Sequence, residues 1–418
     1  MVRLAAPEST LSTKLEALLE ANMSASLSAR TTSMDNLWRN PSLGGRIPLL
    51  DGLRGMCIVL VVAYHFVWVN IESVGLRPWQ KNLHAVTQFG LVGLEIFFVL
   101  SGFLIGGILL DAKHAQNYFR TFYGRRFCRV LPLYTLIFGL FLIGLHIVGP
   151  DSNPTSGVWW DPKAVFNRNP AVWSYAVFLQ NVEFVMHHRI GPVWMAVTWS
   201  LALEEQFYAL LPALVRILSV QTIRRLGIWA IFVALFVRLS FWFSGDFFFG
   251  EFFPFPSRVD AFGLGVLAAL ACRHKSTWTW LSSHRPLLYG LVLLFGVGLE
   301  FFRKYPGLLW PIGLTWIDVF ATILLLLIVV NPGRFEKAFF GNRVLMMIGT
   351  VSYAIYVFHY PVSALLHYGF FGLHHASNGS NLAVSGLAFI VVLGLAALSW
   401  RYMEHPILRY AQRTFRYE

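Results

Sequence analysis

An arginine and a histidine interrupt the apolar stretch between residues 52 and 65. Arg54 and His65 are eleven positions apart, so on an α-helix they share one face and lie about 16 Å apart along the axis. An ionisable side chain in a long apolar helix is costly and therefore marks a candidate functional site. The alternative is that Arg54 only anchors the helix at the membrane surface, while His65 is a hydrogen-bonded histidine within a helix bundle.

The composition identifies the class of protein to which this helix belongs. Hydrophobic residues make up 56% of the 418 residues and charged residues only 13%, about half the charged fraction of a soluble domain. The sequence therefore predicts an all-α, polytopic membrane protein. The net charge of +12 is the sum of basic loops, and it does not indicate nucleic-acid binding. Three scattered cysteines predict neither a disulfide framework nor a metal site.

Ten hydrophobic runs are candidate transmembrane helices, and several reach the roughly 20 residues that a bilayer requires. The run at 258–272 is short. The stretch 172–186 is a borderline eleventh candidate, which we interpret as a re-entrant or interfacial helix because a further crossing would reverse every later loop. The ten predicted spans are 53–71, 88–110, 130–149, 193–218, 226–244, 258–272, 286–302, 312–330, 344–366 and 382–403.

Arginine and lysine gather in alternate loops, which predicts the orientation of the chain. Basic loops are enriched on the cytoplasmic side, so ten crossings place both termini in the cytoplasm. Residues 1–47 are expected to be a flexible polar extension with a short amphipathic helix at 13–21, followed by a transmembrane domain over 48–408 and a short basic tail over 409–418. The basic segments are 111–129, 219–227, 272–285, 331–343 and 404–418.

Five titratable side chains from four predicted spans fall at a similar depth, about 18–22 Å from the inner ends of their helices. They are His65, Glu95, Glu204, Glu205 and His359. A histidine oriented by a carboxylate is a usable general base. A proton or ion relay, or polar contacts that only join helices, would explain the same layer.

A second cluster precedes the third span, where Arg126 and Arg129 share a helix face. Guanidinium groups arranged in this way suit phosphates, although anchoring or binding of anionic lipids would also explain them. Basic groups at the inner surface, a histidine halfway through the membrane and the tryptophan-containing outer loop 150–192 together favour a carrier that enters from the cytoplasm and passes a small group to an outside acceptor.

Six sequence blocks resemble the acyltransferase-3 family of integral-membrane sugar O-acyltransferases. They span about residues 48–408 in the family's order, and together they are highly specific. Glu95 stands where the family has Asp or Glu. The blocks are LDGLRGMCIVLVVAYH, GLVGLEIFFVLSGFLI, RRFCRVLPLY, WSLALEEQFY, SRVDAFGLG and SYAIYVFHYPV.

The resemblance implies transfer of an acyl group, usually acetyl, from cytoplasmic acyl-CoA as co-substrate, with no bound cofactor. The implied acceptor is a sugar hydroxyl of a cell-surface polysaccharide or lipopolysaccharide, a lipid-linked precursor or a glycolipid, at the cell membrane. It further implies that His65 is the catalytic centre and that Arg54, Arg126 and Arg129 help to hold the CoA phosphates. The chain would be a version without the extracytoplasmic hydrolase-like domain of some relatives. Such versions also include enzymes that acylate antibiotics.

Combining the residues with the resemblance gives a mechanism. His65, oriented by Glu95 or by Glu204 and Glu205, takes the proton of the acceptor hydroxyl. A covalent acyl-histidine is the alternative. The groups expected to line the meeting point are Glu204, Glu205, Tyr208, Tyr356 and His359.

Two further polar pairs lie near the ends of predicted spans, and a secondary transporter is the alternative class of protein. Arg258 and Asp260 could pair with each other, and Arg401 and Glu404 are interpreted as structural. A secondary transporter would also carry midplane polar groups, but it should show inverted repeats, and the sequence shows none.

Overall fold

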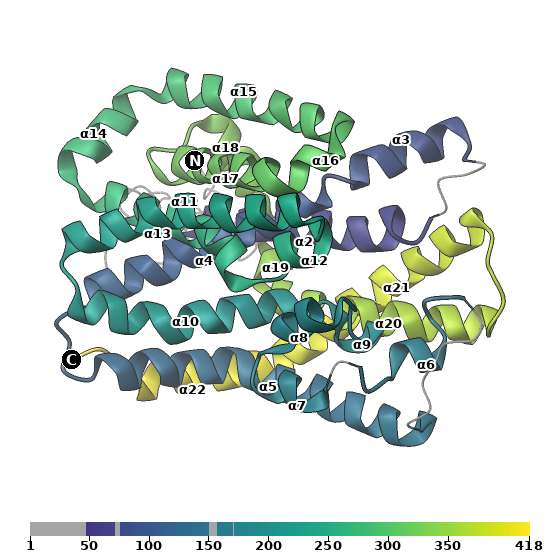
Figure 1. Cartoon of the computed structure of the whole chain (residues 1–418). Helices are drawn as coiled ribbons and strands as arrows, with labels where there is room; N and C mark the ends of the chain where they lie inside the picture. Colours follow the sequence, from purple (N-terminus) through teal and green to yellow (C-terminus); the bar gives the residue numbers. More distant parts are fainter. Residues whose placement is uncertain (1–46, 72–75, 150–156, 170) are drawn as a thin grey trace, which may run out of the picture. The chain divides into compact units, whose positions relative to one another are not determined.

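The computed structural model describes residues 47–71, 76–149, 157–169 and 171–418, and every regular element in these ranges is a helix. The predicted amphipathic helix at 13–21 and nearly all of the N-terminal extension lie outside the described residues. Figure 1 shows long helices, among them α4, α5 and α10, running in nearly the same direction. The all-α, multi-pass class predicted from composition is confirmed.

The first two long helices pack together at unusually close range. Helix α2, Pro48–Ala63, continues into the π-helical turn η1, Tyr64–Trp68, and packs against α4, Gly90–Asp111. A Cβ at position 90 would collide with the Cβ of Tyr64 and the carbonyl of Leu60, and one at position 93 would lie 2.6 Å from the carbonyl oxygen of Cys57. Glycine at these two positions therefore lets the backbone of α4 approach the turn that carries His65.

Three further helices carry residues that line the two cavities described below. They are α5, Tyr118–Val148; α10, Trp199–Ile217; and α20, Ser352–Phe371, which is bent by 72° from α19, Arg343–Thr350. Helix α10 contains three charged residues, Glu204, Glu205 and Arg216, and it is not among the helices that are apolar enough to count as candidate membrane spans. Its charged groups must find partners inside the protein if the helix crosses the bilayer.

The remaining long helices surround this group. They are α11, Val220–Ser244; α13, Val259–Arg273; α15, Arg285–Lys304; α17, Leu314–Val329; and α21, Asn378–Ser399. Shorter elements join them: α3, Pro78–Thr87; α12, Phe247–Phe252; η2, Phe255–Arg258; α14, Lys275–Ser283; α16, Pro306–Leu308; η3, Leu309–Gly313; α18, Arg334–Phe340; η4, Trp400–Glu404; and α22, His405–Thr414.

Eight described helices are long and apolar enough to cross a membrane, or nine if the bent pair α19–α20 is one span. The predicted span 193–218 corresponds to α10, which is not among them. The stretch 172–186 forms α7, Val172–Ala176, and α8, Gln180–His187, and neither is long enough to cross a bilayer. The cytoplasmic location of the termini stays a prediction.

The two short helices that flank this stretch are α6, Pro162–Val165, and α9, Val193–Ala196. At the other end of the chain, the predicted tail over 409–418 begins inside α22, and its last residues lie against the start of α5. There the carbonyl oxygens of Phe415 and Arg416 accept hydrogen bonds from Arg125 and Asn117.

Candidate functional site

Two cavities lie next to each other between α2, α4, α10 and α20. The basic cavity, of about 340 Å³, is lined by four arginines together with polar groups of α4, α10 and α20. The aromatic cavity, of about 210 Å³, is lined by His65 and by aromatic side chains that include Trp199, Phe252, Trp310 and Tyr360. Leu94 and Tyr356 line both cavities, so the two spaces meet at these side chains.

The three predicted CoA-binding arginines, Arg54, Arg126 and Arg129, all line the basic cavity, and Arg125 joins them. Arg125 is held from the C-terminal side, because its Nε donates to the carbonyl oxygen of Phe415 at 2.7 Å. The guanidinium of Arg126 lies over the ring of Tyr208, 4.8 Å from its centre. The structure thus brings the arginines together, and their role as phosphate ligands stays a prediction.

Glu204 faces the basic cavity and not His65. Its two carboxylate oxygens accept hydrogen bonds from the hydroxyl groups of Ser101, at 3.0 Å, and Tyr208, at 3.0 Å. For the neighbouring Glu205, oxygen Oε1 is buried and has no hydrogen-bond partner among the described residues. Tyr208 lines the basic cavity, so this predicted lining residue belongs to the arginine side of the site.

His65 is paired with another histidine. Its Nδ1 lies 3.1 Å from Nε2 of His359, and Nδ1 of His359 lies 2.6 Å from the backbone carbonyl oxygen of Tyr356. A carbonyl oxygen only accepts, so Nδ1 of His359 must carry a proton. In a neutral His359, Nε2 is then the acceptor, and Nδ1 of His65 must be the donor. This leaves Nε2 of His65 unprotonated and able to take a proton.

Aromatic residues hold the histidine pair in place. The ring of Tyr360 meets His65 edge-on, with 4.8 Å between ring centres. The hydroxyl of Tyr356 lies 2.5 Å from Oγ of Ser200 and donates to the carbonyl oxygen of Val197 at 2.7 Å. His65 also lies within the π-helical turn η1, a local widening that is frequent at functional sites.

Glu95 does not orient His65 in this structure. Its carboxylate forms an ion pair with Arg258, and both side chains are almost fully buried. The prediction that Glu95 orients His65 rested on the similar depth of the two residues along their helices. In the structure Glu95 lines neither cavity and pairs with Arg258 instead. The guanidinium carbon of Arg258 in turn lies 4.8 Å from the centre of the Phe252 ring. Phe252 lines the aromatic cavity. The pair therefore supports a wall of that cavity.

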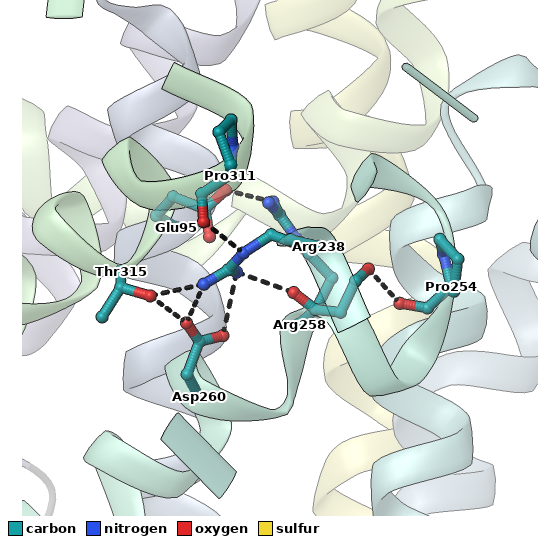
Figure 2. A network of polar contacts seen from close by, with 8 residues as sticks. Glu95, Arg238, Pro254, Arg258, Asp260, Pro311 and Thr315 are labelled. Atoms are coloured by element: carbon teal, nitrogen blue, oxygen red, sulfur yellow. Dashed lines mark hydrogen bonds and ion pairs between the residues drawn. The ribbon is translucent and has the colours of Figure 1, made fainter. Parts of the chain in front are cut away.

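Arg258 and Asp260 pair with different partners and not with each other. Asp260 accepts from Nη2 of the buried Arg238 at 2.7 Å, and Arg238 also donates to the carbonyl oxygens of Ser257 and Pro311 (Figure 2). Pro311 follows Trp310 of the aromatic cavity directly, so this second pair also fixes cavity-lining backbone. At the far end of the chain, Glu404 accepts from Oγ of Ser399 at 3.0 Å.

Sequence reasoning missed Arg238, Ser101, Ser200 and Tyr360. Arg238 carried a usable signal, because a lone arginine inside the apolar span 226–244 requires a buried partner. The hydroxyl residues gave no such signal, since serine and tyrosine are common in membrane helices. Among the described residues no group of three or more His, Cys, Asp or Glu side chains could hold a metal ion.

Comparison with known proteins gives a family match over most of the chain. A model of a family described as an acyltransferase domain matches residues 47–401. The peptidoglycan O-acetyltransferase OatA of Listeria monocytogenes is 27% identical over 86% of this chain and 56% of that relative. The O-acetyltransferase OatA of Staphylococcus aureus is 24% identical over 88% of this chain and 58% of the relative.

A third relative, the putative peptidoglycan O-acetyltransferase YrhL of Bacillus subtilis, is 29% identical over 88% of this chain and 56% of its own length. The chain thus spans little more than half the length of these curated relatives. None of the solved structures matches it.

Proposed function

This chain belongs to the acyltransferase family, and we propose that it moves an acetyl group from acetyl-CoA to a hydroxyl of a cell-wall polysaccharide such as peptidoglycan. The observation that carries the proposal is the meeting of the two cavities at Leu94 and Tyr356. One space offers guanidinium groups to a phosphorylated carrier, and the other offers a histidine to an acceptor. The names of the relatives support an acetyl group and a glycan acceptor.

The donor binds in the basic cavity under this proposal. Arg54, Arg126 and Arg129 contact the CoA phosphates, because planar guanidinium groups bind phosphate through paired hydrogen bonds. The pantetheine arm extends along the cavity toward Leu94 and Tyr356. The thioester carbonyl then lies at the junction, within reach of an acceptor in the aromatic cavity.

His65 acts as general base on the acceptor hydroxyl. Its Nε2 takes the hydroxyl proton while the hydroxyl oxygen attacks the thioester carbon, and the carbon–sulfur bond breaks. The proton then passes from Nε2 to the leaving sulfur, so the products are an ester and the free thiol of CoA. His359 accepts a hydrogen bond from Nδ1 of His65 throughout and stabilises the imidazolium that forms. Attack by Nε2 itself, giving an acyl-histidine, is the alternative sequence of steps.

The test is acetyl transfer in membranes that contain the wild type, His65→Ala or His146→Ala, with labelled acetyl-CoA and peptidoglycan as acceptor. His146 is exposed near the end of α5 and lines neither cavity, so it is the matched control. We expect His65→Ala to lose at least 100-fold in transfer, in the range for loss of a general base, and His146→Ala to match the wild type. Full activity of His65→Ala at equal protein level would refute the mechanism.

The acceptor is tested separately by offering polysaccharide, lipid-linked precursor and small glycosides in turn. Label in peptidoglycan would support the proposal. Label only in a small glycoside would move the activity to antibiotic modification, and the cavity assignment would stay the same. Uptake of a solute without consumption of acetyl-CoA would refute the enzyme mechanism.

A further inference from the structure

One face of α4 lines both cavities, and its side chains divide between them in order. Leu91 lines only the aromatic cavity, Leu104 lines only the basic cavity, and Leu94 lines both. The cavity-lining residues Gly90, Leu94, Phe97, Ser101 and Leu104 recur every three or four positions, so they share one face of α4. Leu94 is therefore the position on α4 where one space gives way to the other.

Helix α20 shows the same division between the two cavities. Tyr353 lines the basic cavity, Tyr360 lines the aromatic cavity, and Tyr356 lines both. The hydroxyl of Tyr356 is fixed by Ser200, at 2.5 Å, and by the carbonyl oxygen of Val197, at 2.7 Å. A ring held at its far end cannot swing away to widen the junction.

The backbone of α4 is equally fixed. The close approach of Gly90 and Gly93 to α2 leaves no space for α4 to move toward α2, and movement away would open a void in a packed interior. The width of the junction is therefore set mainly by the side chain of Leu94, which is half-buried and, like Tyr356, lines both cavities.

We infer that Leu94 and Tyr356 form a selectivity constriction that limits the acyl group to a short chain, and that Leu94 is its adjustable side. This inference rests on the proposed function, because the acyl carbon must reach His65 in one cavity while the CoA phosphates stay in the other. An acetyl group adds one methyl carbon beyond the carbonyl, whereas a butyryl group adds three. Each added carbon must fit beside Leu94.

The magnitude follows from the discrimination that apolar pockets achieve. One methylene in an apolar pocket changes kcat/KM by about 10- to 200-fold. The wild type should therefore favour acetyl-CoA over propionyl-CoA by at least about 10-fold, and over butyryl-CoA by more. Leu94→Ala removes three carbon atoms from the constriction, so it should raise the butyryl-to-acetyl ratio of kcat/KM by at least about 10-fold.

The experiment measures transfer from acetyl-, propionyl- and butyryl-CoA to the same acceptor in membranes. The variants are Leu94→Ala and the milder Leu94→Val, with Leu91→Ala and Leu104→Ala as matched controls on the same helix. We expect the ratio to rise in both Leu94 variants, more in Leu94→Ala, and to change less than about threefold in the controls. If Leu94→Ala does not accumulate, Leu94→Val is decisive through its propionyl-to-acetyl ratio, which should rise.

Two results would overturn the inference. An unchanged ratio in a folded Leu94 variant would show that acyl length is set elsewhere, and an equal rise in the Leu91 or Leu104 controls would show a general loosening of α4. Failure of the proposed function looks different, because the wild type would then transfer none of the three acyl groups. That result would refute the inference together with its premise.

Discussion

The pairing of His65 with His359 gives the sharpest test of the mechanism, through His359→Ala. In the wild type, Nδ1 of His65 donates to Nε2 of His359 across 3.1 Å. If His65 takes the acceptor proton as proposed, this bond becomes a hydrogen bond from a charged donor, a kind worth about 1.5–3 kcal/mol. Its loss should lower kcat by about 10- to 150-fold.

The change should appear in kcat and leave the KM for acetyl-CoA near its wild-type value. The reason is that His359 lies in contact with His65 and is not among the residues that line the basic cavity. The assay is the initial rate of labelled acetyl transfer in membranes at varied acetyl-CoA, normalised to the amount of folded protein. His359→Gln offers an amide oxygen as replacement acceptor and should recover part of the lost rate.

Two results would refute this account of His359. An unchanged kcat in His359→Ala would show that His65 needs no partner at Nδ1. A kcat in His359→Gln as low as in His359→Ala, with both proteins folded, would show that His359 acts by packing and not as an acceptor.

The remaining predictions concern the charged groups around the two cavities. Arg129→Ala should raise the KM for acetyl-CoA by about 10- to 150-fold with a smaller change in kcat, because one charged hydrogen bond to phosphate is lost; equal KM values would contradict the assigned donor site. Glu95→Ala should lower the free energy of unfolding by about 3–5 kcal/mol by leaving Arg258 buried without its partner. Glu95→Leu combined with Arg258→Met should recover most of that stability, as measured by thermal unfolding in detergent, and a double variant no better than Glu95→Ala would exclude the unpaired charge as the cause.

Much of the fold follows from apolar run length, and part of the site follows from depth along each helix. Because one turn advances the chain by about 5.4 Å, His65 and His359 could be placed at the same height from the sequence, and the structure shows them in contact. The convergence of Arg54, Arg126 and Arg129 on one cavity agrees with the sequence prediction that all three help to hold the same phosphates.

The depth of a residue along its helix does not give the direction in which its side chain points. For this reason the prediction that Glu95 orients His65 was wrong. Glu95 lies at the predicted height but faces Arg258, which is 163 positions away in the chain. The partner of Asp260, Arg238, lies on yet another helix. Rotation of each helix about its axis depends on how all the helices pack, and an almost uniformly apolar helix such as α4 offers no polar face from which to infer it.

The separation of the histidine pair from the buried carboxylates has a physical consequence for the reaction. Glu95 and Asp260 are each compensated by an arginine, and Glu204 by two hydroxyl donors, so none of them places an uncompensated negative charge next to His65. Two neutral imidazoles can be buried at far lower cost than a charged pair. In the proposed mechanism, positive charge then arises on His65 only while it holds the acceptor proton. In an apolar cavity such a charge is unfavourable unless an anion lies close, and in the proposed reaction the leaving thiolate of CoA would be that anion. The site therefore favours proton transfer to the sulfur in close step with cleavage of the carbon–sulfur bond.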